Sequence, residues 1–327
     1  MKHLAVIGAG LAGLTAANQL QQRANVTLFE KSRGVSGRLS TRRADPYAFD
    51  HGAQFFKVRS DAFRACIDPM LRDGTVQRWD ARFAEIDDTT IVQSRQWDEE
   101  FPHYVGVPGM SAIGKYLSRG LDIRLGTRVV SVQRQGDQWT LLDEQGISLG
   151  AYDGVISSVP AQQASDLLPA SLPFHSALSG PPMRGCFALM LGFPRPIPIE
   201  FDAALVRGRD ISWISLNSSK PGRGEACSLL VHSTNAWADK HMEDNRDWVM
   251  DYLCDQTSAV IGIDVGNAPH KAVHAWRFAN IEKQAGPTHF ISPDQHIGVC
   301  GDWLIQGRVE AAFTSGLAMA NNLLETL

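Results

Sequence analysis

The stretch LAVIGAGLAGLTAANQL at residues 4–20 decides the fold of this chain. An apolar run leads into Gly8, Gly10 and Gly13 in the pattern G-x-G-x-x-G, and an Ala- and Leu-rich helical pattern follows. In a strand–turn–helix unit the first glycine permits the tight turn, the second lets the backbone approach a pyrophosphate, and the third lets the helix pack against the strand. The stretch predicts a phosphate-binding turn, although so short a pattern is also compatible with a purely structural turn.

A second predicted strand favours the phosphate-binding turn over a purely structural turn. Residues 26–29 (VTLF) form this strand, which ends at Glu30, 20 residues after Gly10 (30 − 10 = 20). A carboxylate at this distance binds the ribose hydroxyls in dinucleotide-binding folds, and the helix N-terminus near Ala12 offers unpaired N–H groups to the phosphates. We therefore predict an α/β domain for a dinucleotide whose adenosine ribose has a free 2′-hydroxyl.

Length and composition set the outer limits. The 327 residues suit two compact units, and a net charge of −4 argues against nucleic acid as a partner. The five cysteines are an odd number without a C-x-x-C pair, which argues against a disulfide framework and indicates a reducing compartment. The apolar run before Gly8 is too short for a signal peptide, and no run approaches the ~18 residues of a membrane span. We expect a cytoplasmic protein without a membrane partner; its oligomeric state stays open.

The basic segment KSRGVSGRLSTRR (31–43) and the run FDHGAQFF (49–56) point to a particular cofactor. Gly37-Arg38 resembles the "G-G-R" element of the flavin-containing amine oxidase superfamily, with Ser36 where the first glycine often stands. FDHGAQFF is similar to that superfamily's "D-x-G-x-x-x-F/W" run, whose backbone borders the flavin ring. The resemblance implies FAD, with Arg38 beside its pyrophosphate.

The chain returns to the same cofactor near residue 302. Asp302 matches the acid that bonds the ribityl and pyrophosphate side of FAD, and a helix beginning at residues 308–310 would face the flavin pyrimidine edge. Val129 matches the residue whose backbone contacts adenine. No cysteine follows Cys300 in the C-terminal flavin motif, so noncovalent FAD is expected. The expected cofactor residues are Gly8, Gly10, Ala12, Gly13, Glu30, Lys31, Gly37, Arg38, Gln54, Phe55, Phe56, Val129, Asp302 and Val309.

The resemblance also implies the domain organisation. We expect a discontinuous Rossmann-like FAD-binding domain of the amine oxidase/PHBH-like type, made of residues 1–60, 105–160 and 280–327. A substrate domain, or cap, of mixed β-sheet plus helices would comprise residues 61–104 and 161–279. Residues 124–146 alternate as a β-meander, with a turn at Gly136-Asp137.

Several cap segments are similar to the renalase family: ISWISLNSSKPGR (211–223), LLVHSTNAWADKH (229–241), AWRFA (275–279) and the GDW near the C-terminus. That resemblance implies oxidation of 2- or 6-dihydro isomers of NAD(P)H to NAD(P)⁺, with electrons passing through FAD to O₂ to give H₂O₂. Hydride transfer to flavin N5 needs positioning and no catalytic acid or base. An anionic substrate needs cations. For its phosphates we expect Lys57, Arg59 and Arg184, and for the pocket walls Trp213, Trp276 and Trp303.

Two other functions stay open, an amine oxidase and a noncatalytic module of the GDP dissociation inhibitor type. The region before the C-terminal helix lacks the tyrosine of the amine oxidase aromatic cage, and Arg59 and Arg184 would repel an ammonium. Intact flavin motifs argue against a module without flavin. GISLG (146–150) lacks the helix that follows a serine nucleophile, and His270 and His274 lie in an alternating, strand-like run, so neither a Ser hydrolase nor a metal site is expected. His51 is interpreted as a structural histidine.

Overall fold

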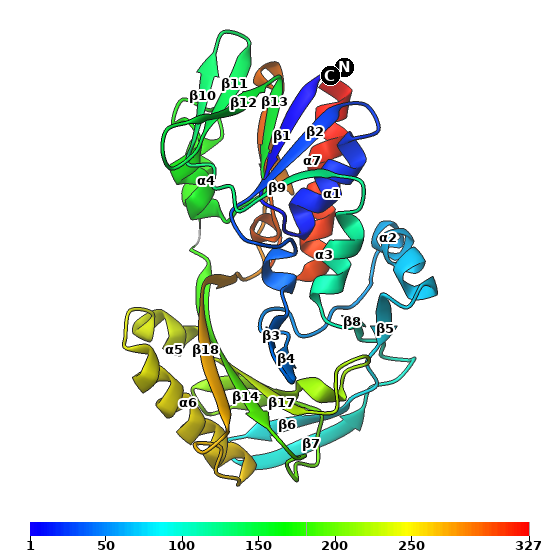
Figure 1. Ribbon diagram of the computed structural model, residues 1–327, viewed down its shortest axis with the longest axis vertical. Helices are drawn as coiled ribbons and strands as arrows, with labels where there is room; N and C mark the ends of the chain where they lie inside the picture. Colours follow the sequence, from blue (N-terminus) through cyan, green and yellow to red (C-terminus); the bar gives the residue numbers. More distant parts are fainter. Residues whose placement is uncertain (181, 327) are drawn as a thin grey trace.

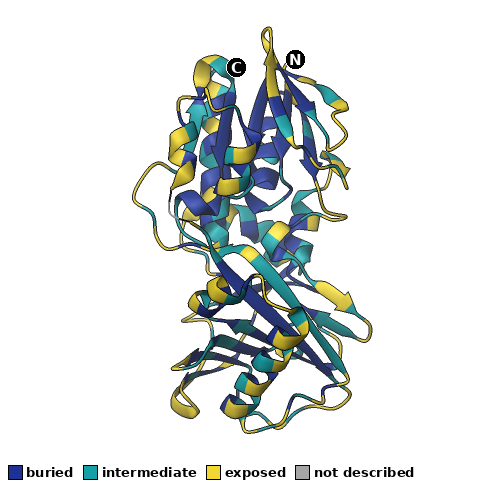
Figure 2. Ribbon diagram, turned by 90° about the vertical axis from the view of Figure 1, so that its left-hand side faces the viewer, coloured by how far each residue is buried: buried dark blue, intermediate teal, exposed yellow. Residues whose placement is uncertain are grey.

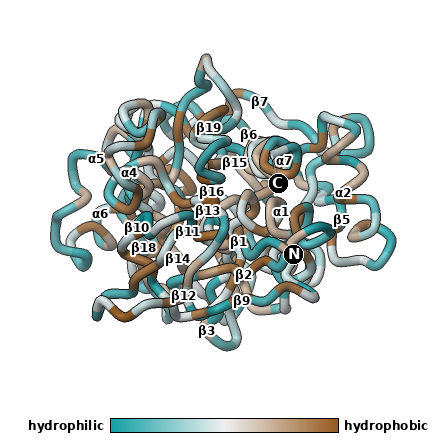
Figure 3. The backbone as a smooth tube through the Cα atoms, turned by 90° about the horizontal axis from the view of Figure 1, so that it is seen from above, coloured by the Kyte–Doolittle hydropathy of each residue, from teal (hydrophilic) through white to brown (hydrophobic). Residues whose placement is uncertain are grey.

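The computed structural model describes residues 1–180 and 182–326 and shows two units stacked along the long axis of the molecule (Figure 1). Both chain ends lie at the top of the upper unit in that view. The strands of both units are largely buried, whereas exposed residues follow the outer helices and loops (Figure 2). Hydrophobic segments likewise run through the middle of the molecule when it is viewed from above (Figure 3).

The upper unit is built on a six-stranded sheet with the order β19-β20-β13-β1-β2-β9. Strand β1 pairs in parallel with β2 and β13, and only the edge strand β19 runs antiparallel to its neighbour β20. The central position of β1 explains its apolar sequence, because a parallel strand is covered on both faces. The bounds are β1 His3–Ile7, β2 Asn25–Glu30, β9 Asp122–Leu125, β13 Gly154–Ser157, β19 His289–Ser292 and β20 Ile297–Cys300.

Helices from opposite ends of the chain cover one face of this sheet. α1 (Leu11–Leu20) and α7 (Val309–Thr326) pack side by side, and their core includes Leu14, Met319 and Leu323. α3 (Ser111–Leu117) lies beside α1. A Cβ added at Gly316 in α7 would lie 2.2 Å from the carbonyl oxygen of Ala12 in α1, so glycine is what allows the two backbones to approach.

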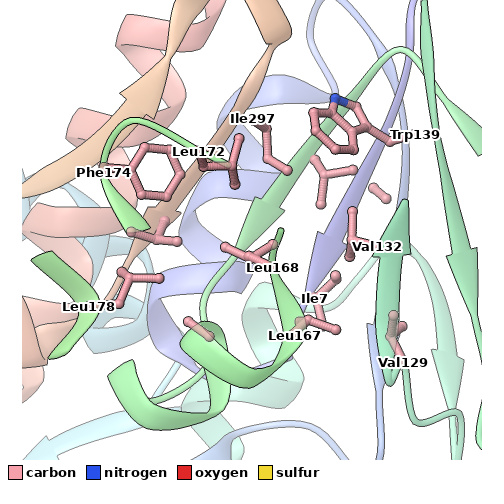
Figure 4. Packing of buried hydrophobic residues seen from close by; sticks show 14 of the residues in the cluster. Ile7, Val129, Val132, Trp139, Leu167, Leu168, Leu172, Phe174, Leu178 and Ile297 are labelled. Atoms are coloured by element: carbon pink, nitrogen blue, oxygen red, sulfur yellow. The ribbon is translucent and has the colours of Figure 1, made fainter. Parts of the chain in front are cut away.

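A β-meander and a short helix cover the other face. β10 (Ser131–Gln135), β11 (Gln138–Leu142) and β12 (Ser148–Tyr152) form an antiparallel sheet, as the sequence predicts. Trp139 is buried there, and its indole N–H donates to the carbonyl of Gln295 over 2.8 Å. Figure 4 shows the shared core, to which α4 (Ala161–Leu167), the 3-10 segment η2 (His175–Ser179) and the chain between them contribute Leu167, Leu168, Leu172, Phe174 and Leu178.

The lower unit is a seven-stranded sheet with the order β18-β14-β17-β16-β15-β6-β7. It is antiparallel except for the pair β15 and β6. α5 (Asn235–His241) and α6 (Arg246–Ile261) cover one of its faces with a core that includes Phe187, Trp237 and Leu253. The strands are β6 Arg82–Asp87, β7 Thr90–Gln96, β14 Arg184–Phe193, β15 Ala203–Arg207, β16 Ile211–Leu216, β17 Cys227–Ser233 and β18 His270–Asn280.

Short elements join the two units. The hairpin β3-β4 meets the uncovered face of the lower sheet, where Phe49 packs with Ala188, Met190 and Leu230. α2 contributes Phe63 to a core that it shares with Phe313 of α7. These elements are β3 Arg42–Ala44, β4 Tyr47–Phe49, α2 Asp61–Arg72, β5 Val76–Arg78, β8 Tyr104–Gly106 and the 3-10 segments η1 Gly37–Leu39, η3 Asn217–Ser219, η4 Pro293–Gln295 and η5 Asp302–Leu304.

The predicted fold class is confirmed: a Rossmann-like parallel sheet carries helices, and a second mixed sheet with helices stands beside it. The domain boundaries remain a prediction. Residues 161–178, which the sequence analysis assigns to the cap, share the core of the upper unit, and we therefore propose a boundary nearer to Arg184. None of the helices in the described ranges combines the length and apolarity that a bilayer crossing requires.

The contact between α1 and α7 gives a prediction. Gly316→Ala should lower the free energy of unfolding by about 1–3 kcal/mol, because the new methyl group meets backbone that cannot move cheaply. This loss should outweigh the gain of about 1 kcal/mol that alanine brings to a helix interior. Urea unfolding followed by circular dichroism measures the effect. The control is Gly286→Ala, where a Cβ meets no atom within 4 Å, and equal stability of the two variants would contradict the prediction.

Candidate functional site

A cavity of about 2220 Å³ lies where the two units meet. Its walls come from the β1–α1 turn, the segments at residues 29–43 and 51–59, strand β18 and the start of α7. A pocket for a single small ligand usually measures roughly 300–1,000 Å³, so this larger space suits a long cofactor together with a second molecule.

The β1–α1 turn uses its three glycines in three different ways. Gly8 has φ +102°, and a Cβ at Gly13 would lie 2.0 Å from the carbonyl oxygen of Gly8, so these two positions require glycine for the turn and the packing. A Cβ at Gly10 meets nothing within 4 Å, because this residue faces the cavity together with Gly8 and Ala12. No side chain caps the N-terminus of α1, whose first backbone N–H groups are therefore available to an anion.

Glu30 lies at the end of β2 and lines the cavity, as does its neighbour Lys31. Its carboxylate accepts hydrogen bonds from the backbone N–H groups of Ala9 and Ser32, each over 2.8 Å. These bonds fix the carboxylate beside the glycine turn, where a ribose would reach it. Val129 lines the same end of the cavity.

The second glycine element brings Arg38 to Asp302. Gly37 has φ +51°, and a Cβ there would lie 3.3 Å from the Cα of Gly10, so the two glycine segments touch. Arg38 donates to both carboxylate oxygens of Asp302, over 2.9 and 2.5 Å. Ser36, which replaces a glycine of the superfamily pattern, has φ 105°, and it is held by bonds from its N–H to Ala9 and from its hydroxyl to Ser111.

Gln54, Phe55 and Phe56 also line the cavity. The amide oxygen of Gln54 accepts from the hydroxyl of Ser215 over 3.0 Å and from the amine of Lys220 over 3.2 Å. Lys220 in turn donates to the buried carboxylate of Asp50 over 3.2 Å. Sequence reasoning missed this cluster, because Asp50 and Lys220 are 170 positions apart and the spacing within either segment does not show that they meet.

The start of α7 forms another wall. Val309 faces the cavity from the first turn of this helix, beside Arg308 and Glu310. The carboxylate of Glu310 accepts from the backbone N–H groups of Arg59 and Ser60, over 2.9 and 2.7 Å. These bonds tie the segment after Phe56 to the helix.

Positive side chains that lack a nearby acid gather in the cavity wall. Among the described residues, Lys57, Arg59, Arg308 and Arg42 line the cavity, and their charged side-chain nitrogens have no carboxylate oxygen within 4 Å. Burial and the neighbouring charges of Arg59, Arg95 and Arg308 lower the pKa of Lys57. The wall therefore carries a positive potential that is suited to an anion.

Arg184 differs from these cations. It lines the cavity, but its guanidinium donates to Asp239, and this acid compensates its charge. Arg184 is therefore a weaker phosphate-binding candidate than the sequence analysis expects.

Of the three tryptophans expected in the pocket walls, the structure places only Trp276 along the cavity. Trp213 packs beside Phe55, Phe83 and Trp97 in the aromatic core of the lower unit. Trp303 is buried in the core shared with the β-meander, where its indole N–H donates to Val159 over 3.1 Å. For Trp213 and Trp303 the expected wall role is wrong, because both rings contribute to cores instead.

Three histidines in the cavity wall were not predicted as site residues: His51, His232 and His274. Burial lowers the pKa of His51 to about 4, and electrostatic repulsion from His274 and Arg42 contributes to this shift. Burial lowers the pKa of His232 to about 4 as well, and it also lowers that of His274. These imidazoles are therefore uncharged at neutral pH. No group of three or more metal-ligating side chains occurs within residues 1–180 and 182–326.

The arrangement fits FAD. The open face of Gly10 and the uncapped start of α1 suit a pyrophosphate, and Glu30 suits the adenosine ribose. Arg38 and Asp302 lie on the path from there to Phe55 and the start of α7, where the flavin is expected.

Asp302→Ala should reduce the FAD content of the purified protein, because it removes a polar group of the cofactor wall and leaves Arg38 without its partner. We expect FAD to dissociate at least about tenfold more readily, in line with the loss of a charge-assisted hydrogen bond. The ratio of absorbance at 450 and 280 nm after desalting measures the effect. Asp294→Ala, at an exposed acid in η4, is the matched control, and full flavin content in Asp302→Ala would remove Asp302 from the cofactor site.

Comparison with known proteins agrees with this geometry. Residues 6–68 match a family model described as an NAD(P)-binding Rossmann-like domain, and residues 78–324 match one described as flavin containing amine oxidoreductase. The 4,4'-diapophytoene desaturases of Staphylococcus aureus (strain Newman) and Staphylococcus haemolyticus (strain JCSC1435) are 40% and 41% identical over 67 and 63 residues. Each of these matches covers 19% of this chain but only 13% and 12% of the respective desaturase.

Solved structures share the fold over the whole length. A protein described as a protoporphyrinogen oxidase from Exiguobacterium sp. 255-15 has a TM-score of 0.77 at 13% identity, with 99% of both chains covered. Putrescine oxidase bound to putrescine has a TM-score of 0.70 at 12% identity, also with 99% of both chains covered. Because the amine oxidoreductase model matches well over half of the 327 residues, the chain belongs to the flavin-containing amine oxidoreductase family, whose members are FAD-dependent oxidoreductases.

Proposed function

We propose that the protein oxidises 2-dihydro or 6-dihydro isomers of NAD(P)H to NAD(P)⁺. In this reaction the dihydropyridine ring loses a hydride, which carries two electrons, and becomes an aromatic pyridinium. Bound FAD supplies the hydride acceptor, and O₂ takes up the two electrons with two protons to give H₂O₂. The proposal rests on the resemblance of the cap segments to the renalase family and on the charge of the cavity wall.

The observation that carries the proposal is the set of uncompensated cations around the cavity. Lys57, Arg59 and Arg308 line the cavity, and the charges of Arg59 and Arg308 contribute to the lowered pKa of Lys57. Arg42 lines the cavity from strand β3. The pyrophosphate of a dinucleotide substrate would be attracted to such a wall. A protonated amine would be repelled by it.

The work that this reaction asks of the protein is positioning. Effective hydride transfer needs the reacting atoms about 3–3.5 Å apart and little water between them. Phe55 and Phe56 supply apolar wall, and Gln54 is held rigidly by Ser215 and Lys220. Because the imidazoles of His51 and His232 have pKa values of about 4, they cannot act as proton donors at neutral pH.

We further propose that FAD is held without a covalent bond and that the protein works in the reducing cytoplasm. All five cysteines are free. Burial raises the pKa of Cys186, which lines the cavity, and of Cys300, next to Gly301, to about 12 in each case. Both thiols therefore stay protonated, which makes them poor nucleophiles toward a flavin.

Anaerobic reduction tests the proposed substrate class. Borohydride-isomerised NAD⁺ should bleach the flavin absorbance at 450 nm rapidly in a stopped-flow experiment, whereas ordinary NADH and the diamine putrescine should not. Readmitting O₂ should restore the absorbance and release one H₂O₂ per flavin. Bleaching by putrescine alone would replace the proposal with an amine oxidase, and a purified protein that neither carries nor takes up FAD would favour a noncatalytic module.

The uncompensated cations of the cavity wall give a second prediction. Arg59→Gln should raise KM for the isomerised dinucleotide about three- to tenfold with little change in kcat, because one exposed contact to a phosphate is lost while the reacting geometry is kept. The matched control is Arg72→Gln at the exposed end of α2, outside the cavity wall. An unchanged KM in Arg59→Gln, or the same change in both variants, would remove Arg59 from the substrate site.

A further inference from the structure

One part of the lower sheet is left uncovered where it faces the cavity. Side chains of a strand alternate between its two faces. On β18, Val273 and Ala275 pack with the core under α5 and α6, so His274 and Trp276 stand on the opposite face. Both of these side chains are half-buried and line the cavity.

The strand register adds a second imidazole to this face. His274 pairs with Ala188 on β14, and Ala188 pairs with His232 on β17. The two imidazoles therefore flank a residue with a single methyl group. Ala188 itself is buried beneath Phe49, whereas both imidazoles line the cavity.

His51 completes the surface from the other unit. Its ring stacks on Trp276 with centroids 5.1 Å apart and meets His274 edge-on at 5.0 Å, while His274 and Trp276 are 4.4 Å apart. The backbone oxygen of His51 accepts from the indole N–H of Trp276 over 2.8 Å and from Nε2 of His232 over 3.3 Å. Because a carbonyl can only accept, Nε2 of His232 carries the proton. We call His51, His232, His274 and Trp276 the ring wall.

The ring wall has no charge at neutral pH. Burial keeps all three imidazoles deprotonated, and positive groups on neighbouring elements act in the same direction: Arg42 and Arg246 on His274, Arg42 on His51 and Lys220 on His232. An uncharged, half-buried aromatic surface offers stacking and hydrogen bonds but little attraction for a phosphate. The nearby guanidinium of Arg42, which has no acid within 4 Å among the described residues, offers that attraction instead.

We propose that the ring wall binds a flat heterocyclic ring of the substrate, while the adjoining phosphate lies toward Arg42. The assignment rests on the proposed function and specifies which side chains recognise the dinucleotide. A dinucleotide substrate contains two flat heterocyclic rings, the pyridine ring derived from nicotinamide and the adenine. Because the ring wall would hold one ring and Arg42 the adjoining phosphate, the positions of these two groups set the orientation of the whole ligand.

Binding of the product NAD⁺ to the FAD-loaded protein tests the ring wall without turnover. Trp276→Leu should raise the Kd for NAD⁺ about tenfold in isothermal titration calorimetry, the loss expected for one stacked base. Trp276→Phe, which keeps an aromatic face, should restore most of the affinity. The matched control is Trp248→Leu, at an exposed cap tryptophan outside the cavity, which should bind like the unmodified protein.

Two shorter ligands identify the ring. Nicotinamide mononucleotide carries the pyridine ring and one phosphate, and AMP carries the adenine and one phosphate. If the wall holds the pyridine ring, Trp276→Leu weakens only the first of these ligands; if it holds adenine, the variant weakens only the second. Arg42→Gln should weaken the same ligand that Trp276→Leu weakens, because the phosphate and its base are neighbours.

The proposal is overturned if Trp276→Leu keeps full FAD content and melting temperature yet binds NAD⁺ as tightly as the unmodified protein. It is also overturned if Trp276→Phe binds no better than Trp276→Leu, or if the unmodified protein binds none of the three ligands. Affinity for NAD⁺ that changes between pH 6 and 8 and becomes constant in His274→Gln would show a charged wall and would likewise exclude it. If NAD⁺ binds and depends on Trp276 but dihydro isomers do not reduce the flavin, the ring wall stands and the proposed function falls.

Discussion

The carboxylate of Asp50 is the contact on which the geometry of the cavity depends. It is fully buried and accepts from Lys220, from Arg223, from the hydroxyl of Thr41 and from the backbone N–H of Met110. Burial alone would raise its pKa, but the two cations and the hydrogen bonds hold it below the ordinary value. Burial lowers the pKa of Lys220 to about 8 in spite of the attraction of Asp50. Because an unpaired charge in such a place costs several kcal/mol, the three segments that supply these donors are locked to one arrangement around Asp50.

Both paired and unpaired charges line the cavity. On the cofactor side Arg38 and Asp302 compensate each other, and neutral backbone N–H groups at α1 face the phosphates. On the substrate side Lys57, Arg59 and Arg308 have no such compensation, and the ring wall adds no charge. A long anionic ligand would therefore find its anchoring points in a fixed order.

Local patterns pointed to residues that the structure gathers around one cavity, because each expected cofactor contact is encoded within a few residues. The glycines at 8, 10 and 13 and the acid at 30 act through backbone geometry that their own spacing specifies. The substrate side depends on contacts between distant residues, which spacing does not encode. Trp213 and Trp303 have neighbours that favour core packing, and Asp239 neutralises Arg184 from 55 positions away. The family resemblance assigns residues 161–178 to the cap, yet their leucines fit the face of the sheet beside the β-meander.

The order of strands in the upper sheet also affects how the protein is made. β20 pairs with β13, and α7 packs on α1, so residues 297–326 complete a core that begins at residue 3. During synthesis the nascent chain exposes the apolar faces of β13 and α1 until those residues have left the ribosome. Contacts of such long sequence separation form slowly, and exposed apolar strands favour aggregation. The FAD site is therefore assembled only once residues 297–326 have been made, and the supply of FAD at that moment can determine how much of the newly made chain reaches the native state.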